Sequence, residues 1–391
     1  MRCKNVLDRL SSRGYEVKII VSKKIKGTLA SMSDENNIYR QFHLLNSSEN
    51  ILDRLIKDYL DVKFLHQVIN SFNPDLIYLW QTSSITKAIF PYLAEYDLPI
   101  VYDEGDAGLI NSWLYRGTWF SYIQRKSKSK IKNKIKLIIA KIISRISGNL
   151  IKERWNWPGN IRVYFNSDLG KKNALAQGIP VSNAPVIKSG VDSEKFSFRV
   201  RDQVNSPIRI IVPGRIEPNK GQLDDILFLS YLGEKKIEAD LTIVGKSTSA
   251  SYYQEIQDMI KRLGLEKRAR ILPMVDHNKL INLYQESDIC FFSSHRKTGL
   301  SRIPLEAMAC GCLLITNGNE GANEIVENNR TGYIVSKNDF QGTAVIIEKI
   351  ISDSSVYRKI TANARQVIEQ KYSLEEYTDK IEAFLLDAVN S

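Results

Sequence analysis

One stretch of the sequence combines features that bind phosphate with a residue that binds sugar hydroxyls. It covers residues 298–311 and lies between two apolar runs, Ile289–Phe292 and Leu313–Thr316, that are typical of buried strands. Ser301 is a good helix N-cap, so we expect a helix to begin there, with N–H groups and a dipole that attract anions. Glu306, about one turn further, has the carboxylate needed to accept hydrogen bonds from two adjacent ribose hydroxyls. The stretch therefore predicts a site for a phosphate-containing ligand.

Strands and helices alternate along the chain, which indicates buried parallel sheets and an α/β fold. With 391 residues, the chain is long for one hydrophobic core and comfortable for two. The polar segment 196–207 is the best linker candidate, because the strand pattern restarts directly after it. We expect a first domain over residues 1–200, a second over 201–370, and a C-terminal helix over 371–391 that returns to the first domain. The predicted strands are Val17–Val21, Leu76–Trp80, Ile100–Tyr102 and Val163–Phe165, then Ile208–Val212, Leu241–Val244, Ala269–Leu272, Ile289–Phe292 and Leu313–Thr316.

Five elements of the second half, in order, resemble those of glycosyltransferase family 4, also called Glycosyl transferases group 1. They are Pro213–Gly221, Leu241–Gly245, the E-x7-E region at 298–306, Gly321–Glu327 and Thr331–Val335. In the first half, Arg13–Val17, Phe165–Asp168 and Ile187–Phe196 resemble the same family more weakly. The resemblance implies a GT-B fold, with two Rossmann-like doubly wound domains that face each other across a cleft.

The resemblance also implies an enzyme: a retaining hexosyltransferase that uses a UDP- or GDP-sugar and a sugar or lipid-linked acceptor. Its products would belong to cell-surface polysaccharide or glycolipid, such as capsule or lipopolysaccharide. Arg215 and Lys220 would be catalytic, because two cations beside the leaving diphosphate stabilise the charge that develops there and remove the need for a metal ion. The remaining donor-binding residues implied by the family are Gly214, Thr298, Gly299, Leu300, Ser301, Glu306 and Glu324.

The chain departs from the family pattern at two positions of the expected site. Thr298 replaces the first Glu of E-x7-E, and a hydroxyl cannot carry negative charge beside a developing oxocarbenium ion. On the acceptor side, Gly105 stands where the family often has a His before Asp106. Glu104 and Asp106 are therefore the candidates for acceptor contact, with Asp106 as the proton acceptor. The alternative is that these carboxylates only cap their loop.

The beginning of the sequence lacks the family's first strand and glycine-rich loop. Residues 1–4 resemble sequence beyond that loop, so we expect the chain to begin inside the first helix, from a truncated or misassigned start. This feature, with Thr298, leaves a catalytically impaired nucleotide-sugar-binding remnant as one alternative function. A GT-B nucleotide-sugar epimerase is the other, and it would convert the donor without an acceptor.

Positive charge is concentrated in one segment. Eleven Lys or Arg residues and one acid lie in residues 121–154, which leaves ten of the chain's formal net charge of +11 there. Isoleucines recur at helical spacing among these lysines, which predicts a basic amphipathic helix. Such a helix suits an anionic membrane surface, and Trp155 and Trp157 after it favour an interface. Alternatively, the isoleucines pack on the domain core. Nucleic acid is not expected, because no aromatic platform accompanies the lysines.

The remaining composition predicts a cytoplasmic protein, peripheral at the inner face of the membrane if the basic helix binds lipid. No apolar run approaches the roughly 20 residues of a membrane span, and no signal peptide follows Met1. The four cysteines have no paired spacing, which favours a reducing compartment and packing roles. The four histidines are scattered, so no metal site or cofactor is expected.

Overall fold

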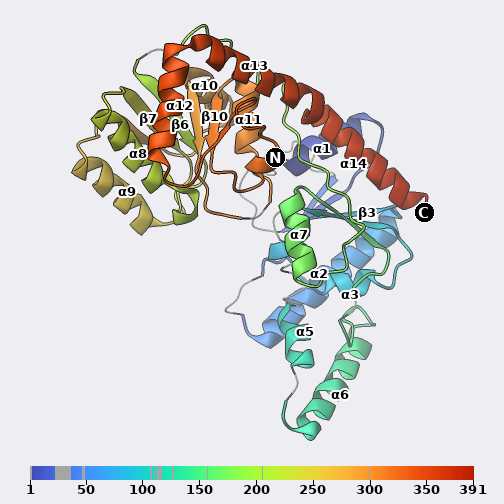
Figure 1. The fold of residues 1–391 in the computed structure, drawn as a ribbon. Coiled ribbons are helices and arrows are strands. Elements are labelled where there is room, and N and C mark those ends of the chain that lie inside the picture. The colour runs from blue at the N-terminus through green and yellow to red at the C-terminus, as the bar shows by residue number, and fades with distance from the viewer. Residues whose placement is uncertain are drawn as a thin grey trace. The chain divides into compact units, whose positions relative to one another are not determined.

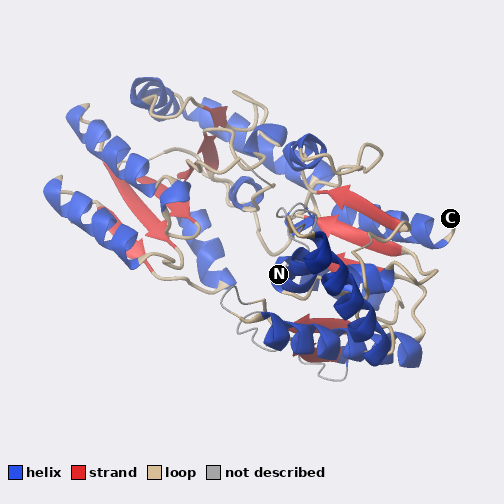
Figure 2. Cartoon of the chain, turned by 90° about the horizontal axis from the view of Figure 1, so that it is seen from below, coloured by secondary structure: helices blue, strands red, loops and turns tan. Residues whose placement is uncertain are grey.

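The computed structural model divides the chain into two compact units. It describes residues 2–22, 37–45, 49–105, 108–109, 111, 117–125, 127–155, 157–204, 206–297 and 299–391. The first unit comprises Met1–Asn166, Gly170–Ile187 and Thr378–Ser391, and the second comprises Ser167–Leu169 and Lys188–Tyr377. Both are built from parallel strands and helices (Figures 1 and 2), as the alternating pattern predicts.

The first unit contains two small parallel sheets. One pairs β1 with β2, and the other has the order β3-β4-β5. Its strands are β1 (Ile19–Ser22), β2 (Ile38–Phe42), β3 (Ile77–Trp80), β4 (Ile100–Glu104) and β5 (Ile161–Phe165). Its helical segments are α1 (Arg2–Ser12), α2 (Ile51–Phe72), η3 (Thr82–Ser84), α3 (Ile89–Leu93), α5 (Gly117–Gln124), α6 (Lys130–Ile146) and most of α7 (Asp168–Ala176). The first residues of α7, Asp168 and Leu169, group with the second unit. Every residue of β4, the central strand of the sheet β3-β4-β5, is buried.

The second unit is a six-stranded parallel sheet in the order β11-β10-β9-β6-β7-β8. Its strands are β6 (Ile208–Pro213), β7 (Ala239–Val244), β8 (Ala269–Leu272), β9 (Ile289–Phe292), β10 (Leu313–Thr316) and β11 (Tyr333–Ile334). Its helical segments are η4 (Pro218–Lys220), α8 (Gln222–Glu234), α9 (Ala250–Arg262), α10 (His277–Glu286), α11 (Ile303–Cys310), η5 (Ala322–Glu324), α12 (Phe340–Ser352) and α13 (Ser354–Lys371); α14 (Leu374–Val389) starts here and ends in the first unit's segment.

The order of these strands creates a topological switch point between β6 and β9. From β6 the chain builds outward through β7 and β8, then returns to β9 and builds the other way through β10 and β11. Ile210 and Val212 face one core with α8, α9 and α12, whereas Ile211 faces a second core with α10, α11 and α13. Ligands of doubly wound sheets bind outside the carboxyl ends of the strands at such a point.

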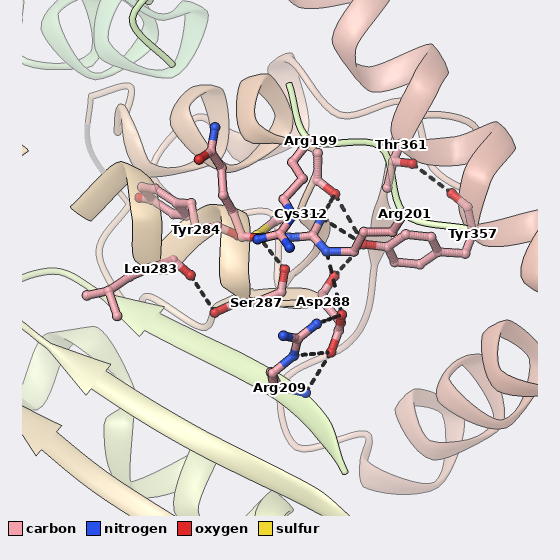
Figure 3. Close-up of polar contacts among 12 residues, drawn as sticks. Arg199, Arg201, Arg209, Leu283, Tyr284, Ser287, Asp288, Cys312, Tyr357 and Thr361 are labelled. Atoms are coloured by element: carbon pink, nitrogen blue, oxygen red, sulfur yellow. Dashed lines mark hydrogen bonds and ion pairs between the residues drawn. The ribbon is translucent and has the colours of Figure 1, made fainter. Parts of the chain in front are cut away.

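The segment predicted as a linker is fixed to the second unit, whose main segment begins at Lys188 rather than at residue 201. The buried guanidinium of Arg201 donates to the carbonyls of Gly311 and Tyr284 at 2.8 and 3.1 Å. It also lies 3.6 Å from the carboxylate of Asp288, which Arg209 binds at 2.9 Å (Figure 3). The polar residues that make this segment resemble a linker are therefore used in hydrogen bonds to its own unit.

The end of the chain groups with the first unit from Thr378 onward. Within that unit, Arg13 forms ion pairs with Glu382 and, at 2.5 Å, with Asp379. Arg162 of β5 is paired with Asp387 and lies over the ring of Phe384. These contacts attach the last turns of α14 to α1 and β5.

Candidate functional site

The structure brings the loop after β6 against the start of α11. Gly214 has φ +132°, and a Cβ at this position would lie 3.2 Å from Cδ1 of Ile303, the first residue of α11. Gly221, at the other end of the loop, has φ +76°, and a Cβ there would lie 2.4 Å from the carbonyl oxygen of Ser293 after β9. Both contacts require glycine. The basic loop and the predicted anion-binding helix start are therefore neighbours at the switch point of the sheet.

Lys220 is the more enclosed of the two predicted cations of this site. Its side chain is 10% exposed, and its Nζ lies 2.8 Å from each carboxylate oxygen of Glu320. The hydroxyl of Ser294 donates to the same carboxylate at 2.9 Å, and Nε of Arg296 lies 3.7 Å from it. Glu320 was not among the predicted site residues. The one sequence signal for it is an acidic residue directly before a glycine of a family motif.

Arg215 is less constrained than Lys220. Its side chain is 50% exposed and pairs with Glu217 at 3.1 Å. Its carbonyl oxygen accepts a hydrogen bond from the amide of Gln222 at 2.9 Å, which fixes the backbone of the loop to α8. The guanidinium can therefore reorient towards a ligand while its backbone stays in place.

The start of α11 differs by one residue from the prediction. Arg302, not Ser301, is the N-cap, and it makes no side-chain capping bond. The Ser301 hydroxyl still accepts a hydrogen bond from the N–H of Ile303 at 3.4 Å, while the Ser301 N–H donates to the carbonyl of Glu320 at 3.0 Å. The prediction was wrong because Ser301 is held by the neighbouring loop, so the helical turn begins after it.

The remaining residues of this loop have distinct positions. Gly299 is in the left-handed region with φ +70°, which glycine adopts at little cost. Leu300 is buried in the core formed with α10 and α11. Thr298 lies outside the described residues.

Glu306 is buried in the first turn of α11 with both carboxylate oxygens engaged. Arg302 donates to Oε1 at 2.6 Å, and the hydroxyl of Tyr284 donates to Oε2 at 3.2 Å. Burial and the nearby Glu306 raise the pKa of the Tyr284 hydroxyl well above its usual range, so it remains a donor. Arg302 is 29% exposed and can leave Oε1 to a ligand hydroxyl at modest cost.

Glu324 serves a different part of the second unit. Its carboxylate accepts the N–H groups of Asp168 and Leu169 at 2.9 and 3.0 Å, and it lies 3.5 Å from Nζ of Lys188. A carboxylate with these partners holds the segment 167–169 in place. The donor-binding role of Glu324 stays a prediction.

In the first unit, the carboxylate of Glu104 is buried and accepts the N–H of Leu109 at 2.7 Å. This contact is the one expected from the loop-capping alternative. A Cβ on Gly108 would lie 2.9 Å from the hydroxyl of Tyr102, so the backbone closely approaches the end of β4. Asp106 lies outside the described residues, and the acceptor-side role of both carboxylates stays a prediction.

A small cavity of about 50 Å³ lies close to the site and contains a buried carboxyl. Asp225 lines it together with Phe291, Thr316 and Phe340, among others. Ser293 donates to Oδ1 of Asp225 at 2.6 Å, while Oδ2 is buried without a hydrogen-bond partner among the described residues. Burial raises the pKa of Asp225 to about 7.

Three further features concern the chemistry of the described part of the chain. No group of three or more His, Cys, Asp and Glu side chains in it is placed to hold a metal ion. None of its helices is long and apolar enough to cross a membrane. Cys290, Cys310 and Cys312 are buried, and burial raises the pKa of each thiol, whereas Cys3 is partly exposed.

Comparison with known proteins shows what the second unit resembles. Residues 193–367 match the model of the family described as Glycosyl transferases group 1. The glycogen synthase of Mycobacterium tuberculosis is 27% identical over 189 residues, which cover 48% of this chain and 45% of that protein. CapM of Staphylococcus aureus, a capsular polysaccharide biosynthesis glycosyltransferase, is 27% identical over 221 residues, 56% of this chain and 57% of that protein. The chain thus spans about half the length of the curated relatives it matches.

Solved structures match almost the whole chain. A glycosyltransferase from Rickettsia africae has a TM-score of 0.72 at 20% identity and covers 100% of this chain and 94% of its own. HepE from Anabaena, crystallised with UDP and glucose, has a TM-score of 0.69 at 20% identity and covers 99% of this chain and 95% of its own. At this identity the likeness concerns the fold. The chain therefore has the GT-B fold, and the part of it that resembles Glycosyl transferases group 1 lies in the second unit.

Proposed function

We propose that the protein transfers a hexosyl group, with retention, from a UDP- or GDP-sugar to a sugar or lipid-linked acceptor in cell-surface polysaccharide or glycolipid synthesis. The observation that carries this proposal is the contact between Gly214 and Ile303, which joins the loop of Arg215 and Lys220 to the helix of Glu306. The capsular role in the name of CapM, and the UDP and glucose in the HepE crystal, support the same class of donor and product.

In this proposal three side chains of the second unit act on two parts of the donor. The ammonium of Lys220 and the guanidinium of Arg215 bind the diphosphate. As the bond between the sugar and the phosphate oxygen breaks, its electron pair moves to the diphosphate, and the two cations stabilise the added charge. They do so without a metal ion. Glu306 binds the ribose hydroxyls and fixes the position of the nucleotide.

We also propose that α6 binds an anionic membrane surface, which would bring a lipid-linked acceptor to the enzyme. Of the residues of α6, only Ala140 and Ser144 are buried, whereas Ile131 and Ile146 are 71% and 80% exposed. In the alternative interpretation the isoleucines pack on the domain core, and they would then be covered by it. Exposed isoleucines among lysines match both the apolar boundary and the negative charge of such a surface.

The two tryptophans after α6 pack against other aromatic rings of the first unit. Trp157 stacks on Phe90 with ring centroids 4.7 Å apart, and Trp155 packs at 5.8 Å from the same ring and 5.4 Å from Phe120. Both are partly buried and pack against the core of the first unit. Their position in the sequence suggested an interface, but their apolar rings are used in packing.

Isothermal titration calorimetry with UDP, GDP and other nucleoside diphosphates tests the proposed function and identifies the base. We expect one nucleoside diphosphate to bind, and to bind less tightly to the Glu306→Ala and Lys220→Ala variants. Unchanged affinity in both variants would remove the site assignment. Incubation with the donor alone separates transfer from epimerisation, because an epimerase would convert the sugar without an acceptor. Nucleotide binding without turnover on any acceptor would indicate the impaired remnant.

A further inference from the structure

A single residue, Glu320, occupies two groups that are expected to bind the donor diphosphate, the ammonium of Lys220 and the N–H of Ser301. Its carboxylate lies 2.8 Å from Nζ of Lys220, and its carbonyl oxygen accepts the N–H of Ser301 at 3.0 Å. The ammonium belongs to Lys220, in the loop after β6. The N–H belongs to Ser301, in the loop that leads into α11. The oxygens of an incoming diphosphate would bind the same ammonium and the same N–H.

The backbone of Glu320 is held in an unusual conformation to make these contacts. Its φ of +48° is in the left-handed region, which is unfavourable for a residue with a side chain. Its own N–H donates to the carbonyl of Arg296 at 3.2 Å. The next residue, Gly321, also has positive φ, and a Cβ there would lie 2.9 Å from the carbonyl oxygen of Gly299. Strained residues that the surroundings hold in place cluster at functional sites.

The burial of the pair sets its energetic consequence. Glu320 is 5% exposed, and the side chain of Lys220 is 10% exposed. Removing one partner from a buried ion pair leaves a charge without compensation, so the ammonium needs an anion at all times. In the structure Glu320 provides it. A bound diphosphate could provide it instead, and it carries more negative charge than a carboxylate.

We propose that Glu320 is an internal counter-ion that fills the diphosphate site when no donor is bound and is displaced from Lys220 by the donor. This inference rests on the proposed function and adds a positioning residue to it. Glu320 keeps the Lys220 ammonium in place between turnovers. It also lowers the affinity of the site for the nucleoside diphosphate product, because the carboxylate competes with the diphosphate for the same cation.

Calorimetric titration of UDP, GDP, uridine and guanosine into the wild type, Glu320→Gln and Glu320→Gly tests this inference. Glutamine removes the charge and keeps the size, and glycine removes the carboxylate from a backbone that glycine adopts without strain. We expect both variants to bind the diphosphate about ten times more tightly than the wild type, with nucleoside affinity unchanged. In the Lys220→Ala background, Glu320→Gln should lose this effect, since the two groups no longer compete. Glu327→Gln, which removes the partner of the exposed Arg330, is the matched control and should bind as the wild type does.

The outcomes separate this inference from the proposed function. A purely structural role for Glu320 would weaken diphosphate and nucleoside binding together, and that result would overturn the inference. Wild-type diphosphate affinity in both variants would overturn it as well, while the proposed function stands. Binding of no nucleoside diphosphate by the wild type or either variant would overturn both. Binding by the variants alone would support the counter-ion.

Discussion

The hydroxyl of Tyr284 in α10 donates a hydrogen bond of 3.2 Å to Oε2 of Glu306 in α11. This bond leaves only the more exposed Arg302 on the other oxygen, so the carboxylate is oriented by a buried donor on one side and can exchange partners on the other. A carboxylate held in this way is prepared to receive a pair of hydroxyls. Separate substitutions of Glu306 and Tyr284 can therefore distinguish ligand binding by the carboxylate from its orientation by the hydroxyl.

We expect Glu306→Ala to weaken nucleoside diphosphate binding at least tenfold, because hydrogen bonds to a charged acceptor contribute about 1.5–3 kcal/mol. Tyr284→Phe keeps the ring and the carboxylate and should weaken binding only by about twofold to fivefold, as expected for one lost orienting bond. Calorimetry on both variants gives the comparison. Equal losses in the two variants would mean that Glu306 acts through packing rather than through ligand contact.

Lys220→Ala should lower kcat/KM for transfer by about a hundredfold or more, because it removes a cation at the position where charge develops in the transition state. Arg215→Ala should have a smaller effect, since its side chain is 50% exposed and acts in higher dielectric. Steady-state kinetics, with a nucleotide sugar that the wild type uses as donor, measures kcat/KM of both variants. A larger loss for Arg215→Ala would reverse the assignment of the principal cation.

Stability should depend on pH through Asp225. Because burial raises its pKa from 3.8 to about 7 in the folded protein, its stabilising contribution is fully present below pH 4 and is lost as the pH rises through 7. Asp225→Asn carries no charge, so we expect its stability relative to the wild type to increase by about 4 kcal/mol between pH 4 and pH 8, since one pKa unit corresponds to about 1.4 kcal/mol. Thermal unfolding at both pH values measures the change. Asp258→Asn on the exposed face of α9 is the control, and an unaltered pH dependence in Asp225→Asn would contradict the prediction.

Association with anionic vesicles should depend on α6. Replacing Lys128, Lys130 and Lys132 with Gln should lower binding to vesicles that contain phosphatidylglycerol by about tenfold or more, since each lysine near such a surface contributes about 1 kcal/mol. Nucleotide affinity should not change. Replacing Lys349, Lys359 and Lys371, exposed lysines of the second unit, is the matched control. Vesicle flotation that is equal for the two triple variants would argue against α6 as the contact surface.

A second test of α6 separates apolar insertion from charge attraction. Ile138 is exposed in the middle of the helix, so the substitution Ile138→Ser should leave the folded protein unaffected. We expect it to lower vesicle binding at high salt, where lysine contributions are screened, more than at low salt. Vesicle binding that is insensitive to this substitution at every salt concentration would indicate purely electrostatic attachment.

The strands of the second unit could be predicted closely because their apolar runs are short and bounded by turn residues. β8, β9 and β10 have the predicted limits, and β6 extends the predicted run by one residue. The approach of Gly214 to Ile303 followed from the rule that loops meet at the carboxyl edge of a parallel sheet.

Glu320 and the boundary at Lys188 could not be predicted in the same way. The partner of Glu320 is 100 positions away in the sequence, and its contact with Lys220 depends on a left-handed backbone that no local pattern requires of a glutamate. Arg201 lies in a segment whose polar composition is that of a linker, yet its two terminal guanidinium nitrogens donate to carbonyls of distant residues. Such long-range polar contacts carry no periodic signal.

The distribution of thiols makes the protein convenient for labelling. Cys290, Cys310 and Cys312 are buried with raised pKa values, so they react slowly with maleimides, whereas Cys3 on α1 is partly exposed. A fluorophore or spin label would therefore attach at Cys3 without removal of any native cysteine. One dye per molecule, far in sequence from the nucleotide loops, would give a spectroscopic reporter on the unaltered chain.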